Sequence, residues 1–107
     1  MTDNRKILSL LGLARKAGKI SEGSFKAENS IRSGKAALVI FSGDASAGTR
    51  RKISGICRTH GVPFIGFGNM AENGRAVGAS DISVIAIEDD GFASKIAELA
   101  GQAQVSE

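Results

Sequence analysis

Apolar residues near the start of the chain recur at the three- and four-residue spacing of an amphipathic helix, which predicts a helix over about residues 4–17. Asp3 is placed to cap this helix, and Gly18 is placed to end it. The apolar positions of this helix are Ile7, Leu10, Leu11 and Ala14. A second helix is predicted to open over residues 21–24 and to end at Gly34.

Three short, continuous apolar runs predict strands at residues 37–41, 62–66 and 82–87. The first run is typical of a strand covered on both faces. In the second run, Pro63 lies near the start, where a missing backbone N–H is tolerated.

Helices are predicted between and after these strands, at residues 47–60, 70–77 and 90–100. Ser46 caps the first of them, and Gly61 ends it. Asp89 and Asp90 lie at the positive end of the last helix, where carboxylates are favourable.

A helix therefore separates each strand from the next. This alternation predicts the α/β class: one domain over residues 1–100, built as a three-layer α/β/α sandwich with a mostly parallel central sheet. Residues 101–107 are predicted to form a flexible C-terminal tail.

Charge is strongly segregated along the chain. Residues 1–35 carry eight Lys and Arg against three carboxylates, whereas residues 67–107 carry two against seven. The net charge of +3 therefore hides a basic half that favours a polyanionic partner such as nucleic acid.

The remaining composition excludes several classes of protein. No apolar run approaches the roughly 18 residues of a membrane span, and no signal peptide is evident, so we expect a cytoplasmic protein. One cysteine and one histidine, Cys57 and His60, cannot build a zinc site, and we expect no metal or cofactor. We interpret both residues as part of the apolar stripe of their helix rather than as a catalytic pair.

The segment Gly66–Ala71 matches the dinucleotide fingerprint G-x-G-x-x-G/A between a predicted strand and a predicted helix. Glu88 even follows at the distance of a ribose-binding carboxylate. The helix after the fingerprint is short, however, and only one such unit exists in a chain with 14 glycines. Nucleotide binding is therefore kept as an alternative.

The start of the second helix combines Gly23, Ser24, Phe25 and Lys26. Free backbone N–H groups, the positive helix end and a lysine would converge there on a phosphate. Phe25 has two interpretations, a core residue or a platform that stacks on an unpaired base.

Farther along, Arg75 is the only arginine of the acidic third and stands between Gly74 and Gly78, which indicates either a close backbone approach or a tight helix end.

Four features follow one another along the chain: a glycine-led helix start, an apolar strand followed by Asp44, a basic helix and the segment 74–78. With these features in this order, the chain resembles the kink-turn-binding ribosomal protein family (ribosomal proteins L-seven-Ae and L-thirty-e). Residues 10–19 and 90–95 are especially similar to the bacterial YlxQ-like branch. The resemblance covers about residues 4–100 and implies an α/β/α fold and no enzymatic activity.

The resemblance also implies an RNA site in which the glycine-led helix start reads tandem G·A pairs and the later segment covers a flipped-out base. By position, the RNA-binding residues it implies are Gly23, Ser24, Phe25, Lys26, Asn29, Arg32, Asn73, Gly74, Arg75, Ala76 and Val77.

The chain departs from the family where the helix typically reads Asn-Glu-x-x-Lys. Phe25 and Lys26 hold the Asn and Glu positions, Asn29 holds the Lys position, and Asn73 replaces the usual leucine. A lysine donates hydrogen bonds but cannot accept them from guanine amino groups.

We therefore expect a non-enzymatic protein that binds structured RNA, including ribosomal RNA, with weakened kink-turn selectivity and with association with the ribosome. The alternatives are a nucleotide-binding module that uses Gly66–Ala71 and a protein-interaction domain that uses the acidic third.

Overall fold

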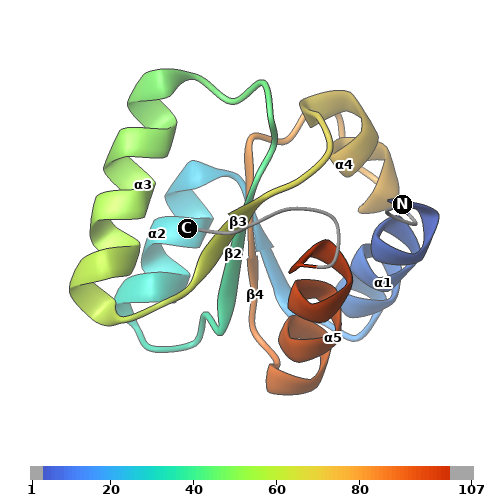
Figure 1. The fold of residues 1–107 in the computed structure, drawn as a ribbon, viewed down its shortest axis with the longest axis horizontal. Coiled ribbons are helices and arrows are strands. Elements are labelled where there is room, and N and C mark those ends of the chain that lie inside the picture. The colour runs from blue at the N-terminus through green and yellow to red at the C-terminus, as the bar shows by residue number, and fades with distance from the viewer. Residues whose placement is uncertain (1–3, 102–107) are drawn as a thin grey trace.

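The computed structural model describes residues 4–101, which form one α/β domain of four strands and five helices (Figure 1). In chain order the elements are α1 (Asn4–Lys16), β1 (Ile20–Glu22), α2 (Ser24–Arg32), β2 (Leu38–Phe41), α3 (Ala47–His60), β3 (Phe64–Gly66), α4 (Met70–Ala76), β4 (Val84–Ile87) and α5 (Asp90–Gly101). Within this described part, no helix has the length and apolar character needed to cross a membrane.

The sheet has the strand order β1-β4-β2-β3 and is mixed. Only β2 and β3 pair in parallel, while β4 runs antiparallel to both of its neighbours, β1 and β2. The prediction of a mostly parallel sheet was therefore wrong. Helix α4 has seven residues, about 10 Å of rise, and is too short to return the chain across the sheet. Instead, Ser83 starts the last crossing beside the end of β2, where its carbonyl accepts the Ser42 N–H at 2.9 Å.

The pattern of apolar residues did not reveal β1. This strand spans three residues, of which only Ile20 is apolar, and all three are half-buried. It pairs along one edge of β4, with Ile20 opposite Ile87. A strand of this length carries too few alternating positions to be recognised by its period.

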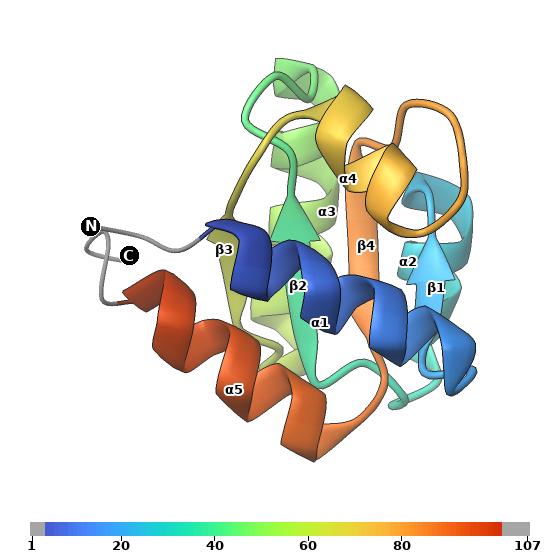
Figure 2. The ribbon, with the colours of Figure 1, turned by 90° about the vertical axis from the view of Figure 1, so that its right-hand side faces the viewer.

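Helices cover both faces of the sheet, as the sequence predicted (Figure 2). On one face, α1 and α5 pack against alternate residues of the central strands, such as Ile40 and Ile85. On the other face, α2 and α3 pack against Val39 and Ala86. All four residues of β2 and of β4 are buried, because each strand is covered on both sides.

The boundaries of the predicted helices largely hold. Ser46 caps α3 by accepting the Thr49 N–H at 3.1 Å, and Gly61 ends the helix in the left-handed conformation with φ 70°. The strand predicted at residues 82–87 begins only at Val84, and the strand predicted at residues 62–66 begins only at Phe64. The predicted cap at Asp3 lies outside the described residues, as does the tail apart from Gly101, which belongs to α5.

Cys57 lies in the core between α3 and the sheet, fully buried, as expected. Burial raises the pKa of its thiol to about 11, although nearby Arg58 acts in the opposite direction. The interpretation of His60 was wrong, because its side chain is exposed and its Nδ1 lies 3.1 Å from the Ile56 carbonyl oxygen. A neutral buried thiol and an exposed imidazole do not form a nucleophile and its base.

The segment between α4 and β4 packs tightly on the backbone of α4. A Cβ added to Gly74 would stand 1.4 Å from the carbonyl oxygen of Ser80, a backbone atom that cannot rotate away. Gly74 is therefore required by packing within the protein.

We expect Gly74→Ala to lower the free energy of unfolding by about 3 kcal/mol or more, because the 78–83 segment must be displaced. Gly55→Ala is the matched control: it lies within α3, has nothing within 4 Å of its added Cβ, and should raise stability by up to about 1 kcal/mol. Urea unfolding measures both changes, and equal stability of the two variants would contradict this packing.

The buried thiol also predicts a dependence of stability on pH. Below the ordinary pKa of 9.0, the thiol is protonated in both the folded and the unfolded chain. Between pH 9 and about 11 only the unfolded chain releases this proton, so the free energy of unfolding should fall by about 1.4 kcal/mol per pH unit. Denaturant titrations should show this excess loss in the wild type relative to Cys57→Ala, and parallel losses would contradict it.

Candidate nucleic-acid interface

The buried side chain of Asn73 joins three segments at one end of the sheet. Its Nδ2 donates to the Ser42 Oγ and to the Phe67 carbonyl, each at 2.9 Å. The Ser42 hydroxyl in turn donates to the Ile82 carbonyl at 2.6 Å. These bonds connect the end of β2, the turn after β3 and the approach to β4 with α4.

This network changes how the predicted residues on α4 are understood. Asn73, Gly74 and Val77 are all buried, so their side chains and backbone hold α4 in place. Arg75 is exposed, and Ala76 is half-buried. Of this predicted group, Arg75 is therefore the side chain positioned to meet a ligand.

The other predicted group lies at the start of α2. Gly23 is the N-cap residue, with φ 90°, and its own N–H donates to the Val84 carbonyl at 2.8 Å. No side chain caps this helix, and the first helical N–H group with an acceptor is that of Ala27, which donates to the Gly23 carbonyl at 2.9 Å. The three preceding N–H groups, of Ser24, Phe25 and Lys26, point out of the positive end of α2.

This start contrasts with the starts of α3, α4 and α5. In each of those helices, a serine, asparagine or aspartate side chain accepts a backbone N–H of the first turn. The uncapped end of α2 leaves donors that an anion can use.

Phe25 follows Gly23 by two residues and is 77% exposed. This exposure excludes the interpretation of Phe25 as a core residue. Ser24, Lys26 and Asn29 are exposed beside it on the first turns of α2. An exposed aromatic ring next to a cation and free N–H groups can stack on a base while the backbone amides bind a phosphate.

Arg32 faces a different neighbour. Its Nε lies 2.9 Å from the Glu28 carboxylate, which also lies 3.4 Å from Lys52 on α3. The hydrogen bond from Arg32 and the charge of Lys52 lower the pKa of Glu28. The structure therefore places Arg32 on the α2–α3 side, within an ion-pair network.

Arg15 of α1 lies between the two groups of predicted residues. Its Nε stands 3.6 Å from the Glu22 carboxylate, one residue before Gly23. Its guanidinium also lies 3.6 Å from the position of a Cβ built on Gly78, just after α4. Topology agrees, because β1 and β2 both run opposite to β4, so α2 begins at the same edge of the sheet where α4 lies.

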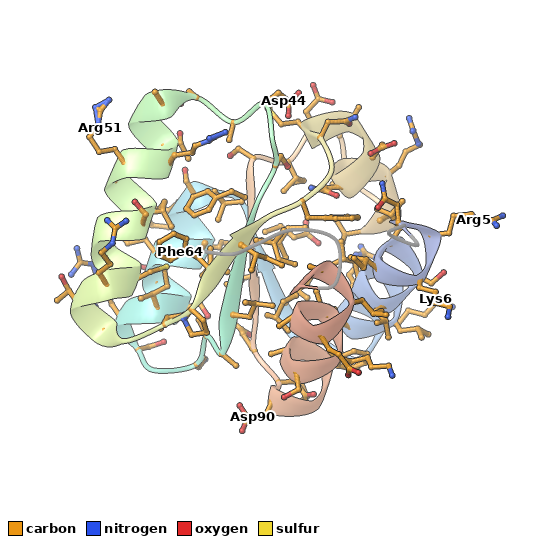
Figure 3. All side chains as sticks on the ribbon, viewed as in Figure 1. Arg5, Lys6, Asp44, Arg51, Phe64 and Asp90 are labelled. Atoms are coloured by element: carbon orange, nitrogen blue, oxygen red, sulfur yellow. The ribbon has the colours of Figure 1, made fainter. Side chains whose placement is uncertain are left out.

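The Gly66–Ala71 fingerprint is already satisfied within the protein. At the start of α4, the Met70 N–H donates to Asp44 Oδ1 and the Glu72 N–H donates to Asn69 Oδ1, both at 2.8 Å (Figure 3 shows Asp44 at this end). The supposed ribose ligand, Glu88, accepts a hydrogen bond from the Ser21 hydroxyl at 2.6 Å. A carboxylate thus lies where a nucleotide phosphate would bind.

Across residues 4–101, no three His, Cys, Asp or Glu side chains gather as metal ligands would. The candidate interface is therefore built from backbone amides, cations and one exposed aromatic ring.

Known proteins share both this sequence and this fold. The chain is 37% identical over 90 residues to the RNA-binding protein YlxQ of Bacillus subtilis, covering 84% of this chain and 90% of that protein. It is 34% identical over 97 residues to the protein of the same name from Enterococcus faecium, covering 91% and 93% of the two chains.

Solved structures agree. A protein of unknown function from Bacillus halodurans superimposes with a TM-score of 0.84 at 37% identity, covering 88% of this chain and 95% of that one. The 15.5 kD RNA-binding protein of Giardia lamblia superimposes with a TM-score of 0.76 at 28% identity, covering 89% and 82%. The sequence profile of one family matches residues 5–98, nearly the whole described part. This chain belongs to the ribosomal protein L7Ae/L30e/S12e/Gadd45 family.

Proposed function

We propose that this chain is a non-enzymatic, cytoplasmic protein that binds structured RNA through the start of α2 and the exposed residues at the end of α4. The observation that carries the proposal is the exposed Phe25 beside Lys26 on a helix start whose N–H groups have no side-chain cap. The names of the relatives support it, because YlxQ and the Giardia protein are RNA-binding proteins.

The residues at the start of α2 have separate roles in RNA binding. Gly23 lets the RNA approach the backbone, and the N–H groups after it, together with Lys26, bind a phosphate. Phe25 stacks on an unpaired base, and the side-chain amide of Asn29, one helical turn later, contacts the RNA beside it.

The α4 residues contribute in two ways. Arg75 binds phosphate directly, and Ala76 borders the RNA beside it. Asn73, Gly74 and Val77 act by positioning this segment, because all three are buried. Arg32 acts at the edge of the interface, since its guanidinium is already paired with Glu28.

We infer weak kink-turn selectivity from the same residues. A phenyl ring stacks on any base, and a lysine attracts any phosphate, so neither reads the edges of a G·A pair. Membership of a family that includes ribosomal proteins supports ribosomal RNA as the target class, and with it an association with the ribosome.

Neither alternative finds comparable support. Asp44 occupies the nucleotide position at the start of α4, and two carboxylates of the last third are engaged in hydrogen bonds within the protein. Asp89 caps α5 by accepting the Phe92 N–H at 2.9 Å, and Glu88 binds Ser21.

Replacing the exposed ring tests the proposal. Phe25→Ala should weaken binding to a structured RNA by about 1–3 kcal/mol, because one base loses its stacking partner. Phe25→Trp, the matched control, keeps a stacking surface and should bind within a few tenths of a kcal/mol of wild type. Fluorescence anisotropy measures the affinities, and unchanged thermal stability confirms that the exposed site was altered without unfolding.

Binding by Phe25→Ala equal to that of wild type would contradict the proposed platform. Affinity for RNA that stays flat between low and moderate salt would contradict phosphate binding, since each neutralised phosphate contributes about one counterion to the salt dependence.

A second prediction concerns selectivity. The triple variant Phe25→Asn, Lys26→Glu and Asn29→Lys restores the usual family residues and should raise the preference for a kink-turn over a matched plain duplex. Each restored base contact should add about 1–3 kcal/mol, as bidentate base readout does. Competition binding with the two RNAs measures the preference, and a wild type that already prefers the kink-turn several hundredfold would contradict weak selectivity.

A further inference from the structure

Cations outnumber carboxylates along the outer side of α1, where they lie beside leucines such as the exposed Leu13. Three shallow hollows lie along this side, between α1 and its neighbours α4 and α5, and Ser9 lines all three. The cations that line them are Arg5, Lys6, Arg15, Lys16, Arg75 and Lys95. Glu72 is the one carboxylate among the lining residues. We call this surface the α1 basic strip.

The sequence of α1 dictates this arrangement. Ile7, Leu11 and Ala14 are fully buried, and Leu8 and Leu10 are half-buried against the same core. The charged residues of the helix are therefore left on its outer side, where all of them are exposed. Arg5 and Lys6 project away from the body of the molecule at one end of the helix (Figure 3). Thirteen helical residues extend about 20 Å, so the cations form a line rather than a single pocket.

Small residues leave the backbone accessible along part of the strip. A Cβ on Gly12 would stand 3.1 Å from the Ala76 carbonyl oxygen, so α1 and α4 pack backbone to backbone here. Ala76 and Gly78 continue this row of small residues between Lys16 and Arg75. An extended ligand can therefore lie close to the helix axes while the longer cationic side chains reach it from both sides.

The strip is continuous with the proposed RNA site. Arg75 lines two of the hollows and is also the exposed cation of the α4 segment. Arg15 lines one hollow and contacts Glu22, next to the start of α2. A polyanion bound at the start of α2 thus meets Arg15 and Lys16, and then Arg75, if it continues toward Arg5.

We propose that the α1 basic strip is a second RNA contact, which holds the sugar–phosphate backbone of a helical arm extending from the RNA bound at α2 and α4. This inference rests on the proposed function. The charged side chains that line the strip are six cations and one carboxylate, and no aromatic ring lines it, which suits contact with phosphates rather than base readout.

The α2–α3 surface differs in its charge balance. Arg32, Lys52 and His60 line a smaller hollow there, but Glu28 pairs with both Arg32 and Lys52. This surface therefore serves as the internal comparison for the strip.

Ser9 provides the test, because it is exposed at the centre of the strip. Ser9→Glu places a negative charge among the cations, and Ser9→Gln is a matched neutral control of nearly the same size; both residues favour helix. Thr59→Glu places the same charge on the α2–α3 surface, where Thr59 is exposed. Two RNAs are compared: a short stem with an internal loop of tandem G·A pairs, and the same RNA with each stem lengthened by one helical turn.

At low salt, Ser9→Glu should bind the long RNA roughly tenfold more weakly than wild type, with a shallower salt dependence. Ser9→Gln and Thr59→Glu should bind it within about twofold of wild type, and all four proteins should bind the short RNA about equally.

Equal binding of the long RNA by Ser9→Glu and Ser9→Gln would overturn the strip while leaving the proposed function intact. A loss in Thr59→Glu as large as that in Ser9→Glu would also overturn it, because the effect would then be one of net charge. An equal loss on the short RNA would overturn its assignment to an arm. Failure of the wild type to bind either RNA would overturn the proposed function and the strip together.

Discussion

The hydrogen bonds of the Asn73 side chain are the constraint on which the binding end of this molecule depends. They fix α4 to the end of β2 and to the turn after β3, and through Ser42 they reach the approach to β4. Because the network is buried, removing the amide would leave the Phe67 carbonyl without its donor, at a cost of about 1–3 kcal/mol. The position of Arg75 on the surface follows from this anchoring, since Arg75 lies two residues after Asn73.

The same anchoring explains the mixed sheet and, with it, the juxtaposition of the two candidate groups. Helix α4 stays at one edge of the sheet, so β4 must run back antiparallel between β1 and β2. Its first residue, Val84, accepts the N–H of Gly23 and thereby holds the start of α2 near the segment that follows α4. The chain thus brings its exposed aromatic ring, its uncapped helix start and the cations Arg15 and Arg75 toward one end.

Much of this fold could be predicted from residue patterns, and the failures have physical causes. The run at 37–41 predicted a strand because β2 is buried on both faces, and Ser46 and Gly61 marked α3 through local capping chemistry. Strand β1 was missed because its stability comes from pairing with β4 rather than from its own three residues. The direction of β4 was missed because it depends on tertiary anchoring of a short helix.

The candidate site was predictable to a similar degree. Gly23 and Lys26 were recognisable from helix-start chemistry, whereas the exposure of Phe25 required the structure. Gly74 and Asn73 looked like ligand contacts in the sequence, but their environment is the interior, against Ser80 and Ser42. Distance along the chain gave no indication that Arg15 would lie beside both Glu22 and Gly78.

Backbone amide NMR shifts during titration with a structured RNA report which surface of this protein binds the RNA. The largest changes should fall on Ser24, Phe25 and Lys26 and on residues 75–78, while the amides of α3 should change little. Changes concentrated on Gly66–Ala71 or along α3, with the start of α2 unaffected, would contradict the proposed interface.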